Sequence, residues 1–184
     1  MTANNLKTTK LINLGPSGRA VAQPIDSGLL DNFYEHLTME RYANVQYFSI
    51  YLWFQERDLD GFASYFLRES QGEMEHAYKF ANYFIARGQT VNLKELPAQI
   101  QTWDSIEEII SYSFNMEADL TSSLQQLYSI SERISDTRSS VFLDPIVDAQ
   151  TKSEDEFAHI LGKVKFAANQ PSAILLIDSD LKKK

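Results

Sequence analysis

The chain has 184 residues, of which 43% are hydrophobic and 23% charged, a composition typical of one soluble globular domain with a buried core. It contains no cysteine, which excludes disulfides, zinc–thiolate sites and iron–sulfur clusters. The net charge of −8 argues against nucleic acid as a partner and favours cations, and no apolar run approaches the roughly 18 residues of a membrane span.

Residues 1–25 differ from the rest of the chain, because they carry basic residues while no acid appears before Asp26. Two interpretations are open: a remnant of a targeting segment, or a flexible arm that contacts another subunit, which we favour. The apolar stretch found in secretory signals is absent. We therefore divide the chain into an N-terminal arm, 1–25, and one domain, 26–184.

Two long helices are predicted over residues 27–57 and 60–87, where large side chains recur with a period near 3.6. The first stripe consists of Phe33, Leu37, Glu40, Asn44, Tyr47, Tyr51 and Phe54, and the second of Phe62, Phe66, Glu69, Glu73, His76, Phe80 and Tyr83. Gly88 is expected to end the second helix as a C-cap glycine.

A long loop follows over roughly 88–103, and loops of this length usually cross a bundle or bind something. Asp104, with Glu107 three residues later, is expected to cap a third helix that runs to about 133.

A fourth helix is predicted from about 137 to 168. Pro145 lies inside it and should either kink the helix or mark a later start. A short fifth helix follows Pro171. The short turns within each helix pair and the long loop between the pairs predict an all-α fold. It is a four-helix bundle with a crossover between the second and third helices.

Each long helix interrupts its apolar stripe near the middle with polar residues, namely Glu40, Glu73 with His76, Glu117, and Gln150. Glu40 and Glu73 are 33 residues apart, and so are Glu117 and Gln150. Because a tight turn joins the helices of each pair, these side chains should lie at similar heights and point to one centre. The two pairs therefore look like related halves of one site.

Three buried carboxylates need compensation, since an uncompensated buried ion costs several kcal/mol and no lysine or arginine occupies the stripes. A metal cation would neutralise them, and Glu73 and His76 share a helix face from which both can bind one ion. Oxygen ligands with one imidazole suit iron, manganese or zinc. The alternatives are a hydrogen-bonded polar cluster and carboxylates on a solvated face.

Four segments resemble those that carry the ferroxidase centre of the ferritin family: MERYANVQYF (39–48), GEMEHA (72–77), NMEADLT (115–121) and DAQTKSED (148–155). The resemblance covers about residues 27–182 and is greatest to cyanobacterial ferritins, which share SDTR, VFLDP and QTKSEDEFA. It implies a cytoplasmic, non-haem cage of 24 identical subunits. Such a cage oxidises Fe(II) with dioxygen or hydrogen peroxide and stores ferric mineral.

The resemblance also implies a role for each residue of the site. The ligands would be Glu40 and His76 for a first iron, Glu73 for both irons and Glu117 for a second. Gln150 matches a glutamine beside the second iron, which we expect to be held more loosely than the first because Gln150 is neutral. Tyr47 matches a tyrosine that can supply an electron to dioxygen, and an ordinary core position is its alternative.

Other acidic residues are candidates for iron transit. Glu69 lies one turn before Glu73, and Glu154 lies one turn after Gln150, although a solvated acidic face would explain both. Asp144 lies near the start of the fourth helix, a region that lines the threefold channels of ferritin cages. Carboxylates there would attract Fe(II).

Three residues resemble ligands but are expected to serve otherwise. His36 should cap the first helix or lie at an interface, and His159 should lie at the surface or at an interface. Met74 matches the haem-binding methionine of bacterioferritins, but the residues around Gln150 do not follow their pattern, and we expect no haem.

Two other classes of function stay open. One is a di-iron oxidase or peroxidase that stores no mineral, and the other is a bundle scaffold with a vestigial metal site. A shell of 24 chains of 21.0 kDa, roughly half a megadalton, would distinguish a storage cage from both.

Overall fold

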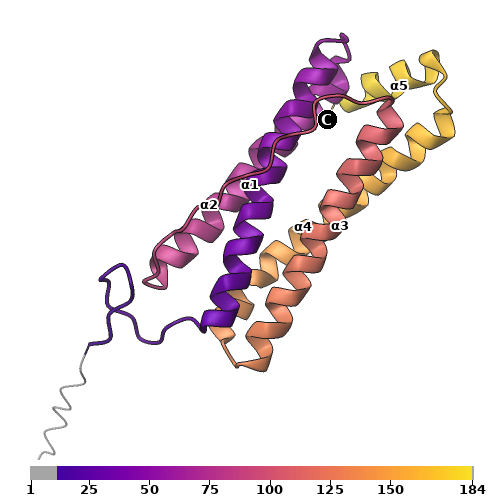
Figure 1. Cartoon of the computed structure of the whole chain (residues 1–184). Helices are drawn as coiled ribbons and strands as arrows, with labels where there is room; N and C mark the ends of the chain where they lie inside the picture. The colour runs from indigo at the N-terminus through magenta and orange to yellow at the C-terminus, as the bar shows by residue number, and fades with distance from the viewer. Residues whose placement is uncertain (1–11, 184) are drawn as a thin grey trace, which may run out of the picture.

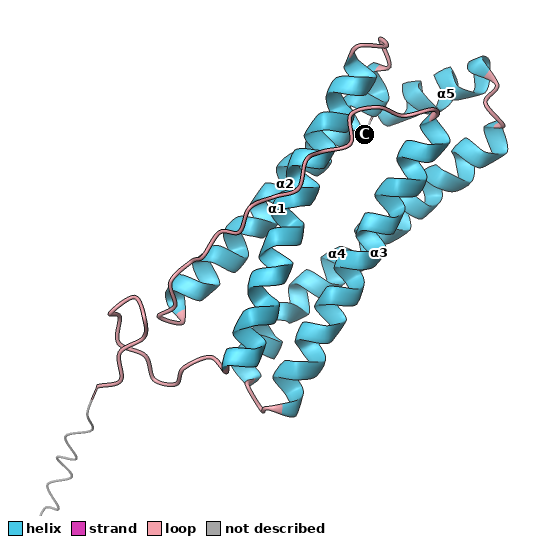
Figure 2. Cartoon of the chain, in the orientation of Figure 1, coloured by secondary structure: helices cyan, strands magenta, loops and turns pink. Residues whose placement is uncertain are grey.

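The computed structural model describes residues 12–183, which form five helices and no strand (Figure 2). The helices are α1 (Ser27–Gln55), α2 (Asp60–Ala86), α3 (Ile106–Arg133), α4 (Thr137–Ala167) and α5 (Pro171–Leu181). The predicted all-α fold is therefore confirmed. Of the predicted N-terminal arm, residues 1–11 lie outside the described residues. Within this described stretch, none of the helices is both long and apolar enough to span a membrane.

The four long helices pack as two antiparallel pairs, α1 with α2 and α3 with α4. The crossover that connects α2 to α3 runs along the length of the bundle (Figure 1). The crossover is held against α1 by the Gln46 side chain. Its Nε2 donates to the Ile100 carbonyl at 2.9 Å, and its Oε1 accepts from the Ile100 amide at 2.8 Å. These two hydrogen bonds fix the path of the loop at Ile100.

Most helix ends follow the sequence signals, with one correction. Asp26 caps α1 by accepting from the amides of Gly28 and Leu29, and Gly88 ends α2 with a positive φ of 74°. The expectation that Asp104 caps α3 is wrong by one residue: Ser105 is the cap, and its hydroxyl accepts from the Glu108 amide at 3.1 Å. Because serine and aspartate are both good caps, adjacent candidates are hard to rank from sequence.

Pro145 lies within α4, which begins at Thr137 and continues through it. The expectation of a later start is therefore wrong. Proline has no amide hydrogen, so the Val141 carbonyl loses its usual helical partner. Val141 is exposed, and water can hydrogen-bond this carbonyl.

Helix α5 packs against the start of α2. The residue before α2, Leu59, makes no side-chain capping hydrogen bond among the described residues. Asp178 of α5 supplies one instead, since its Oδ1 accepts from the Phe62 amide at 2.9 Å. Gly61 allows the close approach, because a Cβ there would lie 1.7 Å from the Asp178 carbonyl oxygen.

The hydrophobic core consists of two clusters with a polar layer between them. One cluster surrounds Phe54, Phe66 and Phe157 and includes residues of α5, and the other surrounds Phe33 and Phe80. Along α1, Leu37 belongs to the second cluster and Ala43 to the first. The side chains between them therefore lie at the midpoint of the bundle, walled off from solvent by packed rings at both ends.

A small hairpin at residues 13–21 covers the C-terminus of α2. Ser17 donates to the Gly88 carbonyl at 2.9 Å, and the Arg19 guanidinium donates to the Ile85 carbonyl at 3.1 Å. A cation and a hydroxyl donor thus satisfy carbonyls at the negative end of the helix dipole.

Candidate metal centre

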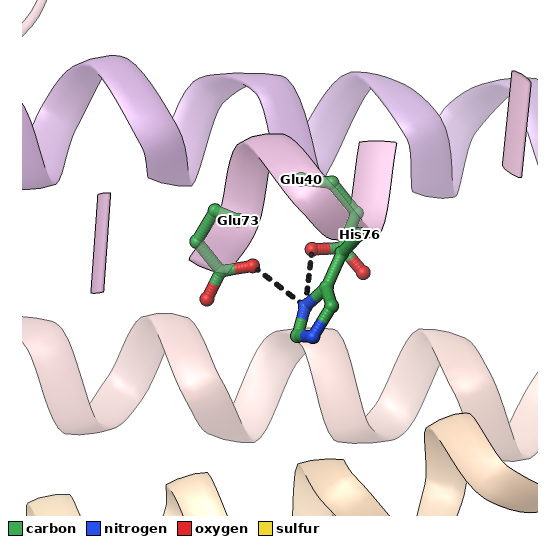
Figure 3. A group of neighbouring side chains, drawn as sticks. All are labelled: Glu40, Glu73 and His76. Carbon is green, nitrogen blue, oxygen red and sulfur yellow. Dashed lines mark hydrogen bonds and ion pairs between the residues drawn. The ribbon is translucent and has the colours of Figure 1, made fainter. Parts of the chain in front are cut away.

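Three predicted ligands meet in the polar layer: Glu40 from α1, and Glu73 and His76 from α2 (Figure 3). Each offers a ligand atom, and these atoms lie within 4.8 Å of one another. His76 Nδ1 is 3.1 Å from Glu73 Oε2 and 3.6 Å from Glu40 Oε2. Glu73 and His76 can share one ion because residues three apart lie on one helix face.

Glu117 and Gln150 form the other side of the layer, from α3 and α4. Gln150 Nε2 donates to Glu117 Oε2 at 2.7 Å and to the Glu117 carbonyl at 3.2 Å. The Tyr47 hydroxyl donates a short hydrogen bond to Glu117 Oε1. Both oxygens of Glu117 therefore have donors, and its carboxylate is not part of the Glu40, Glu73 and His76 group.

The pKa values of Glu40 and Glu73 shift in opposite directions. Burial alone would raise the pKa of Glu40, but the hydrogen bond from His36 and the nearby His76 ring outweigh burial and hold that pKa below its usual range. Burial and the charge of Glu40 raise the pKa of Glu73 well above its ordinary value. For His76, burial disfavours the charged ring, but the adjacent carboxylates of Glu40 and Glu73 prevail and raise its pKa to about 10. The His76 ring is thus the cationic partner of both carboxylates.

The donor set fits a divalent metal ion. Glu40 is fully buried, and its Oε2 has no hydrogen-bond partner in the described part of the chain. Leaving a buried acceptor unpaired is costly, and a cation at this point would satisfy it. Carboxylate oxygens with one imidazole suit iron, manganese or zinc.

His36 is the residue that the sequence argument placed wrongly. It does not cap α1, because the cap is Asp26, and it cannot lie at a subunit interface, because its side chain is fully buried within the chain. Its Nε2 lies 2.9 Å from Glu40 Oε1. The available signal was the i, i+4 spacing of His36 and Glu40, which places both on one face of α1.

The remaining candidates lie outside the cluster. Glu69 is half-buried, and burial together with the charge of Glu117 raises its pKa to about 7. Asp144 is exposed and accepts from the Tyr128 hydroxyl at 2.8 Å, and Glu154 accepts from the Thr121 hydroxyl at 2.9 Å.

The two remaining ligand-like residues also lie apart from the cluster. His159 is exposed, as expected. Met74 is half-buried and lines an apolar groove beside α1, α2 and the crossover.

Comparisons with known proteins identify the family of this chain. The sequence model of the ferritin-like domain matches residues 30–167. A bacterial non-heme ferritin of Bacteroides fragilis is 28% identical over 147 residues, which cover 80% of this chain and 91% of the relative. One from Campylobacter jejuni is 26% identical over 148 residues, covering 80% and 89%.

Solved structures show the same fold. An open-pore ferritin from Archaeoglobus fulgidus superposes with a TM-score of 0.84 at 22% identity, over 88% of this chain and 99% of the other. A PmFTN variant soaked in iron superposes with a TM-score of 0.79 at 30% identity, over 83% and 98%. Because the domain match spans most of the chain and the fold agrees, the chain belongs to the ferritin family.

Proposed function

We propose that this chain is an iron-storage ferritin whose bundle oxidises Fe(II) with dioxygen or hydrogen peroxide. The observation that carries the proposal is the buried Glu40 Oε2, which lacks a hydrogen bond among the described residues and lies beside Glu73 and His76 in the polar layer. The names of the bacterial relatives and the iron-soaked PmFTN crystal support iron as the substrate.

Each residue has a distinct task in this proposal. Glu40 and His76 hold the first Fe(II), Glu73 contacts both ions, and Glu117 holds the second. His76 gives up its ring proton from Nδ1 when it binds, since metal ligation requires that nitrogen's lone pair. Each Fe(II) yields one electron and becomes Fe(III), so two ions held together supply the two electrons that, with two protons from water, would reduce dioxygen to hydrogen peroxide.

Gln150 and Tyr47 orient Glu117 rather than compensate its charge. Both donate to its carboxylate, and neither carries a formal charge of its own at neutral pH. A site with one imidazole and one amide therefore binds its second ion less tightly than its first. This asymmetry suits a site through which iron passes to a mineral, with Glu69 and Asp144 as transit residues.

The test is rapid mixing of metal-free protein with two Fe(II) per chain in air, followed by the near-ultraviolet absorbance of ferric products. We expect a fast phase that Glu73→Ala abolishes. Glu75→Ala is the matched control, because Glu75 is exposed on the same helix. An undiminished fast phase in Glu73→Ala would refute the assignment.

Light scattering tests the assembly proposed here, a cytoplasmic cage of 24 chains with a mass of roughly half a megadalton from 21.0 kDa subunits. A small oligomer with the same fast phase would instead indicate a di-iron oxidase without storage.

A further inference from the structure

The two oxygens of Glu40 are in different environments. Oε1 is 2.9 Å from His36 Nε2, while Oε2 has no hydrogen-bond partner within residues 12–183 and faces His76 Nδ1 at 3.6 Å. A carboxylate that rotated freely would not keep one oxygen directed at the centre. The hydrogen bond from His36 therefore fixes the plane of the carboxylate, so that one oxygen is held at His36 and the other faces the centre.

The His36 ring contacts Ser123 and Phe80 in addition to Glu40. Its Nδ1 lies 2.9 Å from the Ser123 hydroxyl of α3, and the ring packs against the Phe80 ring of α2 with a centroid separation of 4.7 Å and a tilt of 60°. An ionised carboxylate only accepts hydrogen bonds, so Nε2 carries a proton, and in the neutral ring Nδ1 accepts from Ser123. This arrangement links α3, through Ser123 and His36, to a ligand on α1.

The geometry points to His36, held by Ser123, as a positioning residue that makes Glu40 a one-oxygen ligand for the first metal ion. This inference rests on the proposed function, because it requires a metal at Oε2. Outer-shell partners of metal ligands restrict ligand orientation, and their loss typically weakens metal binding 10–100-fold. The role is one of orientation, since His36 Nε2 is directed at Oε1 and both atoms are buried.

The test compares His36→Met with His36→Gln. The two side chains have similar length and flexibility, but only glutamine has an N–H that can donate to a residue four positions along the helix. Anaerobic titration with Co(II) alone, followed by its visible absorption, reports affinity and coordination geometry without any oxidation. We expect His36→Met to bind the first Co(II) about 10–100-fold more weakly, with an altered spectrum, and His36→Gln to recover most of both.

Ser123→Ala provides a second variant if His36→Met does not fold. It removes only the far hydrogen bond of the ring, and we expect a smaller loss of Co(II) affinity with the same direction of spectral change. If folded His36→Met or folded Ser123→Ala kept the Co(II) affinity and spectrum of the parent, the inference would be overturned. Failure of the parent to bind Co(II), or equal binding by Glu73→Ala, would overturn the metal centre itself.

Discussion

Glu73 is the side chain whose replacement best separates a metal centre from a polar cluster. It is 3% exposed, and its ionic partner is the His76 ring at 3.1 Å, which it shares with Glu40. Its pKa is raised from 4.5 by burial and by the charge of Glu40. Because the folded state binds this proton more tightly than the unfolded state does, folding stability falls as the pH rises from the unfolded pKa through the folded one.

We therefore expect Glu73→Gln to stabilise the metal-free protein at neutral pH. The raised pKa of Glu73 is itself a cost to folding at neutral pH, about 1.4 kcal/mol for each unit of pKa difference between the folded and unfolded states, and glutamine removes this cost while Glu40 stays beside His76. For a chain of 184 residues, each kcal/mol shifts the unfolding temperature by about 2–4 °C, so a gain of about 2 kcal/mol raises it by about 4–8 °C.

The assay is thermal unfolding followed by circular dichroism, first with a chelator and then with Co(II). At a free concentration one hundred times the dissociation constant, Co(II) should stabilise the parent by about 2.7 kcal/mol, and Glu73→Gln should lose most of this gain. Glu75→Gln, exposed on the same helix, should change neither value. A Glu73→Gln protein that is less stable without metal, yet keeps the full Co(II) shift, would show that Glu73 belongs to a hydrogen-bonded cluster.

Three further outcomes are expected. Asp136→Asn leaves the buried Arg87 unpaired and should cost about 3 kcal/mol of unfolding free energy at neutral pH, measured by denaturant titration. Burial alone would raise the pKa of Asp136, but Arg87 outweighs burial and lowers it, so this cost should shrink as the pH falls through that pKa, and a cost independent of pH would contradict the pairing. Gln150→Glu should destabilise the metal-free protein and tighten the second metal site in anaerobic calorimetry, and unchanged second-site affinity would contradict the asymmetry. Gly61→Ala should displace α5, with Asp178, from the start of α2 and cost about 1–3 kcal/mol, with faster amide exchange in α5, whereas parent-like exchange would contradict the close packing.

Local periodicity predicted the parts of this molecule that depend on one helix at a time. The stripes of α1 and α2 gave the bundle, and the i, i+3 pair of Glu73 and His76 gave the centre of the candidate site. What escaped prediction depends on contacts between distant residues. Ser123 is 87 residues from His36, and Asp178 is 116 residues from Phe62. No helical period relates such pairs, because they meet only when the bundle closes.

Several predictions stay predictions. The ligand roles, the division of the chain into arm and domain, and the particular likeness to cyanobacterial ferritins are not decided by fold or by family membership. A ferritin-like bundle positions four facing stripes, but the metal preference of the site depends on individual oxygens and donors within it.

The hairpin at residues 13–21 has a consequence for attaching cargo to this chain. A Cβ at Gly15 would lie 2.2 Å from the Gly88 carbonyl oxygen, so the hairpin tolerates little besides glycine at this contact. A peptide or fluorophore fused ahead of Asn13 is therefore tethered to the end of α2. That end, Ala86, lies about 20 Å along the helix from Glu73, at 1.5 Å per residue. A label there can report on the assembly of chains without touching the buried carboxylates.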